Sequence, residues 1–158
     1  MKELSSNHYQ EVDPGTVWHK DEGVVIDVDD DRDPHRVLTP NAIALPGGGY
    51  RMYYYSGEPE RREQGVTGCI VSAHSESGDV WTKEDGLRLD VHTPDAENRT
   101  LCPDVIALPG GGYRMYYQAH SATDRSVVLS ALSTDGLDWR HEPGIRFAVA
   151  DAVCGSPR

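Results

Sequence analysis

The sequence is poor in basic residues. Its 158 residues include 15 lysines and arginines against 26 aspartates and glutamates, so the formal net charge is −11. Nucleic acids and anionic membranes bind basic surfaces, so we predict neither as a partner. No apolar run approaches the roughly 20 residues that cross a bilayer. The first ten residues, MKELSSNHYQ, also lack the apolar core of a signal peptide.

Cysteine is scarce as well. Cys69, Cys102 and Cys154 are an odd number with no close pair, which predicts reduced thiols and a cytoplasmic protein. The sequence has neither C-x-x-C nor H-E-x-x-H, so we expect no metal site and no cofactor. It also lacks the G-x-S-x-G motif of a serine nucleophile. The glycines of LPGGGY lie between two expected strands, which is not the context of a phosphate-binding loop.

The sequence does contain a long internal repeat. The string IALPGGGYRMYY, residues 43–54, returns unchanged at residues 106–117. A second block, residues 72–89, matches residues 130–147, and the two blocks together define a unit of about 54–63 residues. Units of this length are typical of propeller blades rather than of helical solenoids.

Within each unit, short apolar or aromatic runs alternate with turns, and no segment has a sustained helical period. The runs predict four antiparallel strands per unit, which indicates an all-β fold of the β-propeller type. The expected strands are Asn41–Leu45, Tyr50–Ser56, Cys69–His74 and Val80–Lys83 in the first unit, and Asp104–Leu108, Tyr113–Ala119, Val127–Leu132 and Asp138–His141 in the second.

The repeat also predicts the domain organisation. Residues 1–16 are a polar lead-in, and residues 17–158 are a partial propeller. This partial propeller contains the end of one blade (17–38), two blades (39–101 and 102–155) and the start of another (156–158). Because a propeller needs at least four blades to close its ring, about two and a half blades require either a longer parent protein or self-association of copies.

Three features resemble one group of enzymes. These are the string S-x-D-G-x-x-W at residues 133–139, the proline before each inner strand, and the glycine turn followed by YRMYY. Together they resemble the five-bladed propeller glycoside hydrolases of the arabinanase and invertase-like group. The sialidase Asp-box is similar but has one more residue between Asp and Trp. The resemblance implies a five-bladed propeller whose carboxylates meet in a central funnel near the starts of the inner strands.

The resemblance also implies candidate site residues. The residue after the strand-opening proline is Asn41 in the first unit and Asp104 in the second, and Arg158 follows the last proline. Asp104 is therefore the candidate catalytic carboxylate, with the alternative that it only caps a neighbouring backbone amide. Asn41 is a candidate hydrogen-bond donor to a sugar hydroxyl.

Other candidates for substrate binding lie on the loops and strands around the same funnel. Glu58 and His120 are on the longer loops between the second and third strands, where a solvated role is the alternative. Arg51 and Arg114 lie within the aromatic strands, where the alternative is a structural arginine that pairs with a neighbouring blade.

These patterns favour a glycosidase-like propeller that acts on or binds a carbohydrate through its funnel. Glycoside hydrolysis uses two carboxylates, and the strand starts offer only Asp104. Two alternatives therefore stay open: a non-catalytic propeller that serves as a binding or interaction module, and an inactive fragment of a longer glycosidase-like protein.

Overall fold

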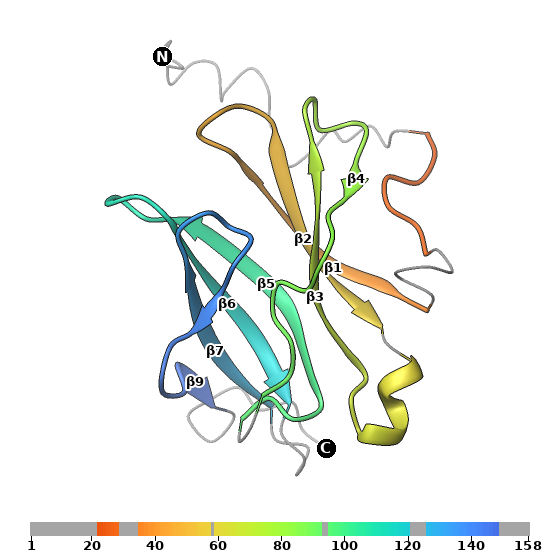
Figure 1. Ribbon diagram of the computed structural model, residues 1–158, viewed down its shortest axis with the longest axis vertical. Coiled ribbons are helices and arrows are strands. Elements are labelled where there is room, and N and C mark those ends of the chain that lie inside the picture. Colours follow the sequence, from red (N-terminus) through yellow and green to blue (C-terminus); the bar gives the residue numbers. More distant parts are fainter. Residues whose placement is uncertain (1–21, 29–34, 58, 93–94, 121–125, 149–158) are drawn as a thin grey trace, which may run out of the picture.

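The computed structural model describes residues 22–28, 35–57, 59–92, 95–120 and 126–148. The first blade consists of β1 (Val37–Ala44), β2 (Tyr50–Gly57), β3 (Gly68–Ser75) and β4 (Thr82–Lys83). The second blade consists of β5 (Arg99–Ala107), β6 (Tyr113–His120), β7 (Ser126–Ser133) and β8 (Arg140–His141). Consecutive strands within each blade pair antiparallel. Figure 1 shows the two blades as separately twisted groups of strands.

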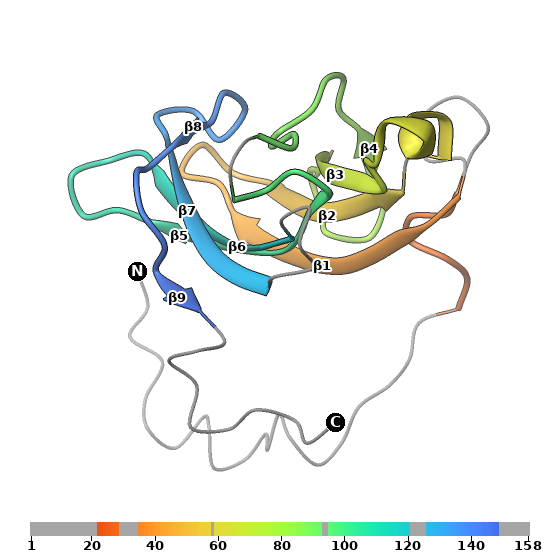
Figure 2. The same cartoon turned by 90° about the horizontal axis from the view of Figure 1, so that it is seen from below.

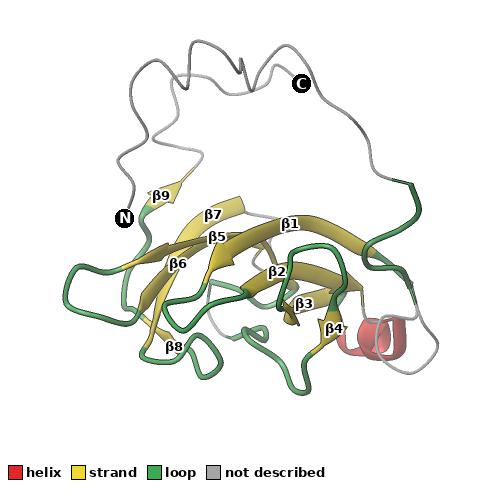
Figure 3. Cartoon of the chain, turned by 90° about the horizontal axis from the view of Figure 1, so that it is seen from above, coloured by secondary structure: helices red, strands yellow, loops and turns green. Residues whose placement is uncertain are grey.

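A single parallel bridge, between Gly68 and Arg99, joins the sheets of the two blades. Figure 2 shows the resulting curved layer of strands, with β1 and β5 belonging to its two halves. Figure 3 shows that strands and loops make up nearly all of the described chain, and that the helical turn η1 (Pro59–Gln64) lies at one end of the first blade. The predicted all-β fold of the propeller type is therefore confirmed.

Glycines set the hairpin that begins β2 and its repeat before β6. Gly49 and Gly112 have φ angles of 73° and 75°, in the left-handed region that favours glycine. A Cβ atom on Gly49 would lie 2.8 Å from the carbonyl oxygen of Ser75, and one on Gly112 would lie 2.6 Å from that of Ser133. The GGGY sequence thus allows the turn to pack directly on the next strand of its own blade.

The main core lies between the two blades. Along β6, buried and partly exposed residues alternate, so Met115 and Tyr117 share one face and point into this core. Tyr53 and Ile70 enter it from the first blade. Trp139 of the second blade packs edge-on against Tyr53 of the first, with ring centroids 5.7 Å apart, so it contributes to the contact between the blades.

In each blade, the third strand pairs with the short fourth strand and then, further along, with a second short segment. In the second blade, β9 (Phe147–Ala148) pairs with β7 beyond β8. In the first blade, Leu89 makes the equivalent bridge to Ile70 of β3. The sequence patterns did not reveal this second short pairing, because only one or two residues make it in each blade.

The expected strands are found, but the inner ones start earlier than predicted. Pro40 and Pro103 lie within β1 and β5 instead of opening them. The longer loop between β2 and β3 contains the turn η1. In the part of the chain that the structure describes, no helix has the length and apolar character needed to cross a membrane.

Candidate functional site

A β-bulge sits at the proline of each inner strand. The register of β1 with β2 shifts between Leu38 and Asn41, and that of β5 with β6 shifts between Leu101 and Asp104. Proline has no N–H to give to a sheet, so a bulge is one of the few places in a strand that accepts it.

The residue before each proline has an unusual backbone conformation. Thr39 and Cys102 have φ angles of 50° and 51°, which are rare for residues other than glycine. Strained residues held by their surroundings concentrate at functional sites. The strain recurs in both blades two residues before Asn41 and Asp104, and the bulges place these two side chains at equivalent positions.

The two bulges are hydrogen-bonded to each other across the blades. The Oδ1 atom of Asn41 accepts a hydrogen bond of 3.0 Å from the backbone N–H of Val105, and its Nδ2 atom donates to Oδ1 of Asp104 at 3.4 Å. The backbone N–H of Cys102 donates to Oγ1 of Thr39 at 3.3 Å. The inner strands β1 and β5 are thus held side by side at the height of Asp104.

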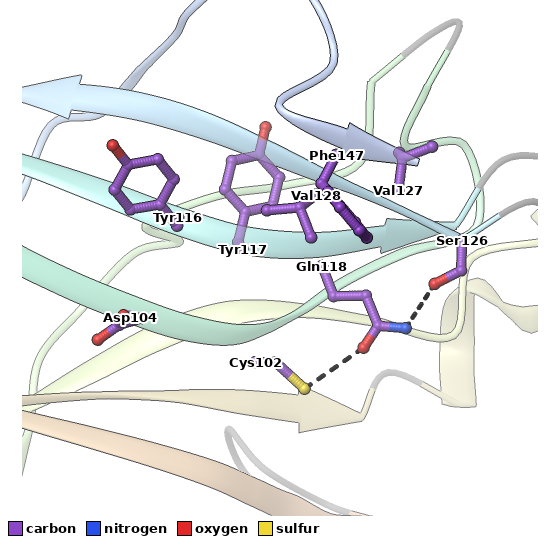
Figure 4. A pocket seen from close by; sticks show the side chains of 9 residues that line it. All are labelled: Cys102, Asp104, Tyr116, Tyr117, Gln118, Ser126, Val127, Val128 and Phe147. Atoms are coloured by element: carbon purple, nitrogen blue, oxygen red, sulfur yellow. Dashed lines mark hydrogen bonds between the residues drawn. The ribbon is translucent and has the colours of Figure 1, made fainter. Parts of the chain in front are cut away.

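Asp104 lies at a cavity of about 350 Å³ on the outer face of the second blade. The lining comes from four strands, and Figure 4 shows the side chains. They are Cys102, Asp104, Tyr116, Tyr117, Gln118, Ser126, Val127, Val128 and Phe147. Apolar and aromatic surface therefore surrounds a single carboxylate.

The polar groups of the cavity are partly fixed by one another. Nε2 of Gln118 donates to Oγ of Ser126 at 2.6 Å, and Sγ of Cys102 donates to Oε1 of Gln118 at 3.5 Å. Figure 4 shows these two bonds on one side of the cavity and Asp104 on the other. Asp104 is exposed and is paired in register with Tyr116 of β6. Its carboxylate is available to a ligand that also contacts this tyrosine ring.

The two arginines proposed for substrate binding lie outside the lining of this cavity. Arg51 is buried and pairs with Glu84 at 2.9 Å, and Arg114 makes the equivalent 2.9 Å pair with Glu142. Burial raises the pKa of Glu84, but hydrogen bonds from Arg51 and Ser72 outweigh it, so its pKa is lowered. In both blades the arginine therefore neutralises a carboxylate that directly follows the fourth strand.

The remaining predicted residues have different outcomes. His120 ends β6 next to the cavity, where its Nε2 atom is 3.1 Å from Nε2 of Gln118. Glu58 lies outside the described residues. Asn41 and Asp104 are brought together, as described above. Tyr116 and Gln118 were not predicted as site residues, although Arg114, Tyr116 and Gln118 follow one another at every second position and therefore share one face of β6.

A second, smaller cavity of about 270 Å³ lies near the outer edge of the second blade. His92 and His141 stack there with ring centroids 3.7 Å apart, and the Tyr117 hydroxyl lies 2.7 Å from Nδ1 of His141. Burial and the nearby His92 lower the pKa of His141 to about 4. Among the described residues, no group of three or more His, Cys, Asp or Glu side chains is arranged to hold a metal ion.

Two four-stranded blades with bulged inner strands place this chain among the β-propellers, and several solved propeller enzymes have a similar fold. A family 117 glycoside hydrolase from Zobellia galactanivorans superposes with a TM-score of 0.61 at 21% identity, over 76% of this chain and 41% of the hydrolase. An endo-arabinase from Bacteroides thetaiotaomicron superposes with a TM-score of 0.53 at 14% identity, over 71% of this chain and 43% of the arabinase.

A third similar structure is a family 43 β-xylosidase/α-arabinofuranosidase from a compost metagenome, in complex with xylotriose. Its TM-score is 0.52 at 19% identity, over 72% of this chain and 36% of the enzyme. No protein-family profile and no curated protein sequence matches the chain. The chain is therefore similar in fold to part of these propeller glycoside hydrolases, and it spans less than half the length of the three enzymes.

Proposed function

We propose that the cavity at Asp104 binds a carbohydrate and forms part of a glycosidase-like active site. The observation that carries this proposal is the position of Asp104, an exposed carboxylate after an inner-strand bulge in a cavity lined by tyrosine and apolar side chains. Sugar hydroxyls need polar partners while sugar ring faces pack on apolar surface, and this cavity offers both.

The proposed substrate class is a pentose-containing polysaccharide or oligosaccharide. The support comes from two proteins of similar fold, one an arabinase and the other a xylosidase/arabinofuranosidase in complex with xylotriose. In this chain, Tyr116 supplies an aromatic ring beside the carboxylate, and Gln118 supplies an amide within the same cavity.

Hydrolysis places a stricter demand on the site than binding. It requires a second carboxylate roughly 5–10 Å from the first, as acid, base or nucleophile. Within the described lining, Asp104 is the only carboxylate, and its counterpart in the first blade is Asn41. A complete active site therefore takes its second carboxylate from another part of the propeller, and carbohydrate binding without catalysis is the second candidate function.

The test compares the full chain with Asp104→Asn, which keeps the shape of the side chain and removes its charge. Xylotriose and arabino-oligosaccharides are titrated by calorimetry, and aryl xylosides and arabinofuranosides are assayed for hydrolysis. We expect Asp104→Asn to weaken binding by about tenfold, since a hydrogen bond to a charged group contributes roughly 1.5–3 kcal/mol. Any hydrolysis should disappear.

The matched control is Asp138→Asn, which makes the same change at an exposed aspartate outside the cavity lining. It should leave binding and turnover unaltered. Saturable binding without turnover, lost in Asp104→Asn, would support the non-catalytic function. Binding and turnover that are equal in the wild type and Asp104→Asn would overturn the role of this carboxylate.

A further inference from the structure

The contact between the two blades includes three hydrogen bonds to one short turn. Two side chains of β2 and one from the outer edge of the first blade donate to three consecutive backbone carbonyls. These carbonyls belong to the turn at residues 133–139 of the second blade. The bonds are Arg51 Nη1 to Asp135 at 2.9 Å, Tyr53 Oη to Gly136 at 2.9 Å, and Arg88 Nη1 to Leu137 at 3.1 Å. The turn is thus docked by its backbone, which any turn of the same conformation could offer.

The second blade carries the same three donors on its own outer face. Arg114 and Tyr116 follow Arg51 and Tyr53 by 63 residues, and Arg146 follows Arg88 by 58 residues. In the part of the chain that the structure describes, no turn carbonyl from another blade accepts a hydrogen bond from these three side chains. The second blade therefore repeats the donors of the docked contact without its acceptors.

The geometry of the repeated donors is already set. In the first blade, Ser72 Oγ donates to Glu84 at 2.7 Å, and Glu84 holds Arg51. In the second blade, Ser130 Oγ donates to Glu142 at 2.7 Å, and Glu142 holds Arg114. Arg114 is therefore oriented like Arg51, and little side-chain ordering remains to be done when a partner arrives.

The apolar side chains of this face are also uncovered. Leu89 is 2% exposed between the blades, whereas its counterpart Phe147 is 49% exposed. Ile43 packs against the main core, whereas its counterpart Ile106 is 44% exposed. The second blade thus shows both the hydrogen-bond donors and the apolar surface of an inter-blade face.

The first blade offers the matching turn. In the turn at residues 75–81, the N–H of Gly78 donates to Ser75 Oγ at 2.8 Å, and Trp81 Nε1 donates to the Gly78 carbonyl at 2.8 Å. The equivalent bonds in the docked turn are 2.8 and 3.0 Å. The carbonyls that correspond to the docked ones belong to Ser77, Gly78 and Asp79.

The charges of the two surfaces are complementary. The turn at residues 75–81 carries the exposed carboxylates Glu76 and Asp79. The donor face carries Arg114 and Arg146, whose side chains are 34% and 36% exposed. Complementary charges of this kind guide encounter and fix orientation.

We propose that the outer face of the second blade, formed by Ile106, Arg114, Tyr116, Arg146 and Phe147, binds the first blade of a second copy of this chain. Tyr116 donates to the Gly78 carbonyl of that copy, and the two arginines reach the carbonyls on either side of it. The arriving blade occupies the side of the cavity lined by Tyr116 and Phe147, so association and carbohydrate binding compete at the cavity of Asp104. The association does not depend on the proposed carbohydrate function.

One segment has to give way for this association. By the repeat, Ile26 and Phe147 both correspond to Leu89, so only one of them can lie between the docked blades. Phe147 is held by strand pairing with Val128. Ile26, without strand pairing to the described residues, packs against the cluster of Tyr54, Cys69, Val71 and Ala73. Lys83 donates a hydrogen bond to the Asp27 carbonyl at the surface. We infer that Phe147 keeps the position and that Ile26 of the arriving copy leaves this cluster.

The test measures the mass of the full chain by sedimentation over a range of concentrations. We expect assemblies of two or more 17.4 kDa chains. Tyr116→Phe removes one hydroxyl from the donor face, and Asp79→Lys reverses one charge on the turn. Each should weaken association roughly tenfold or more, because each removes or opposes one polar contact of the interface.

The control is Glu63→Lys, the same kind of charge reversal at an exposed residue of η1. Figure 1 shows η1 at the end of the first blade opposite to the turn before β4. This variant should associate like the wild type, and circular dichroism should show all variants folded. A monomer at every concentration would overturn the proposal. So would an assembly whose dissociation constant is the same in Tyr116→Phe, Asp79→Lys and the wild type.

Discussion

The two blades contain the same twelve-residue string, yet its side chains have different surroundings. Tyr53 is fully buried and donates a hydrogen bond to the other blade, whereas its counterpart Tyr116 is partly exposed at a cavity. Arg51 is buried while Arg114 is partly exposed, although each holds the equivalent glutamate. The repeat thus determines the strands and turns of a blade, while the neighbour of each blade determines what its side chains contribute.

The largest expected difference between the blades is at these tyrosines. Tyr53→Ala removes a buried ring and leaves the Gly136 carbonyl with one donor fewer, so we expect a loss of about 3–5 kcal/mol in the free energy of unfolding. Tyr116→Ala should cost about 1 kcal/mol, since much of the ring is already hydrated. Urea denaturation monitored by circular dichroism measures both at concentrations where the chain is monomeric, and the two losses should converge where a second copy covers the second-blade face. Equal losses in the monomer would contradict the difference between the two tyrosines.

The sequence predicted those parts of the fold that local chemistry decides. Gly112, with its positive φ angle and its close approach to Ser133, is required by the turn, and the GGGY pattern revealed it. The bulges at Pro40 and Pro103 were read as strand starts, because proline marks an irregularity without saying whether the strand continues past it.

The candidate site was less predictable than the fold. Asp104 became a candidate through the resemblance and its place in the repeat, but the bond from Asn41 to its carboxylate depends on how two blades meet. The stacked pair His92 and His141 has no sequence signal, since the first residue follows the first blade and the second lies in β8. Such contacts join segments that are distant in sequence. They depend on how the blades pack, and the residue pattern of a single segment carries no information about that packing.

The two blades also differ in how they make the stability of the protein depend on pH, and this effect is of intermediate size. His141 corresponds to Lys83 of the first blade, whose Nζ atom donates a hydrogen bond to the Asp27 carbonyl at the surface. Burial and His92 lower the pKa of His141 to about 4, against about 6.5 in an unfolded chain. The unfolded state therefore takes up a proton first, and stability is lost as the pH falls from about 6.5 towards 4.

The expected loss is about 1 kcal/mol, because the half-buried ring is partly screened by solvent. Urea unfolding at pH 7 and pH 4.5 measures it, and His141→Gln serves as the comparison because glutamine does not titrate. The difference between the two pH values should be smaller in the variant by this amount. An unchanged pH dependence would mean that protonation of His141 is not coupled to unfolding.

The smallest expected effect tests the one position where the inner strands differ chemically. Asn41 donates to Asp104 and accepts from Val105, so it needs both a donor and an acceptor. Asn41→Asp keeps the acceptor for Val105 but turns the contact with Asp104 into a repulsion between two carboxylates. We expect a loss of about 0.5–1 kcal/mol at pH 7, the scale of a like-charge pair on neighbouring strands.

Protonation of one of the two carboxylates restores a donor between them, so this loss should vanish at acidic pH. Urea unfolding of Asn41→Asp relative to the wild type at pH 7 and pH 4 measures the change. His141 is present in both proteins, so its titration cancels in this comparison. A loss that is equal at both pH values would show that the two inner-strand side chains are not in contact in solution. Their shared position would then reflect only the repeat of the bulge, and Asp104 would be free to turn fully towards a ligand.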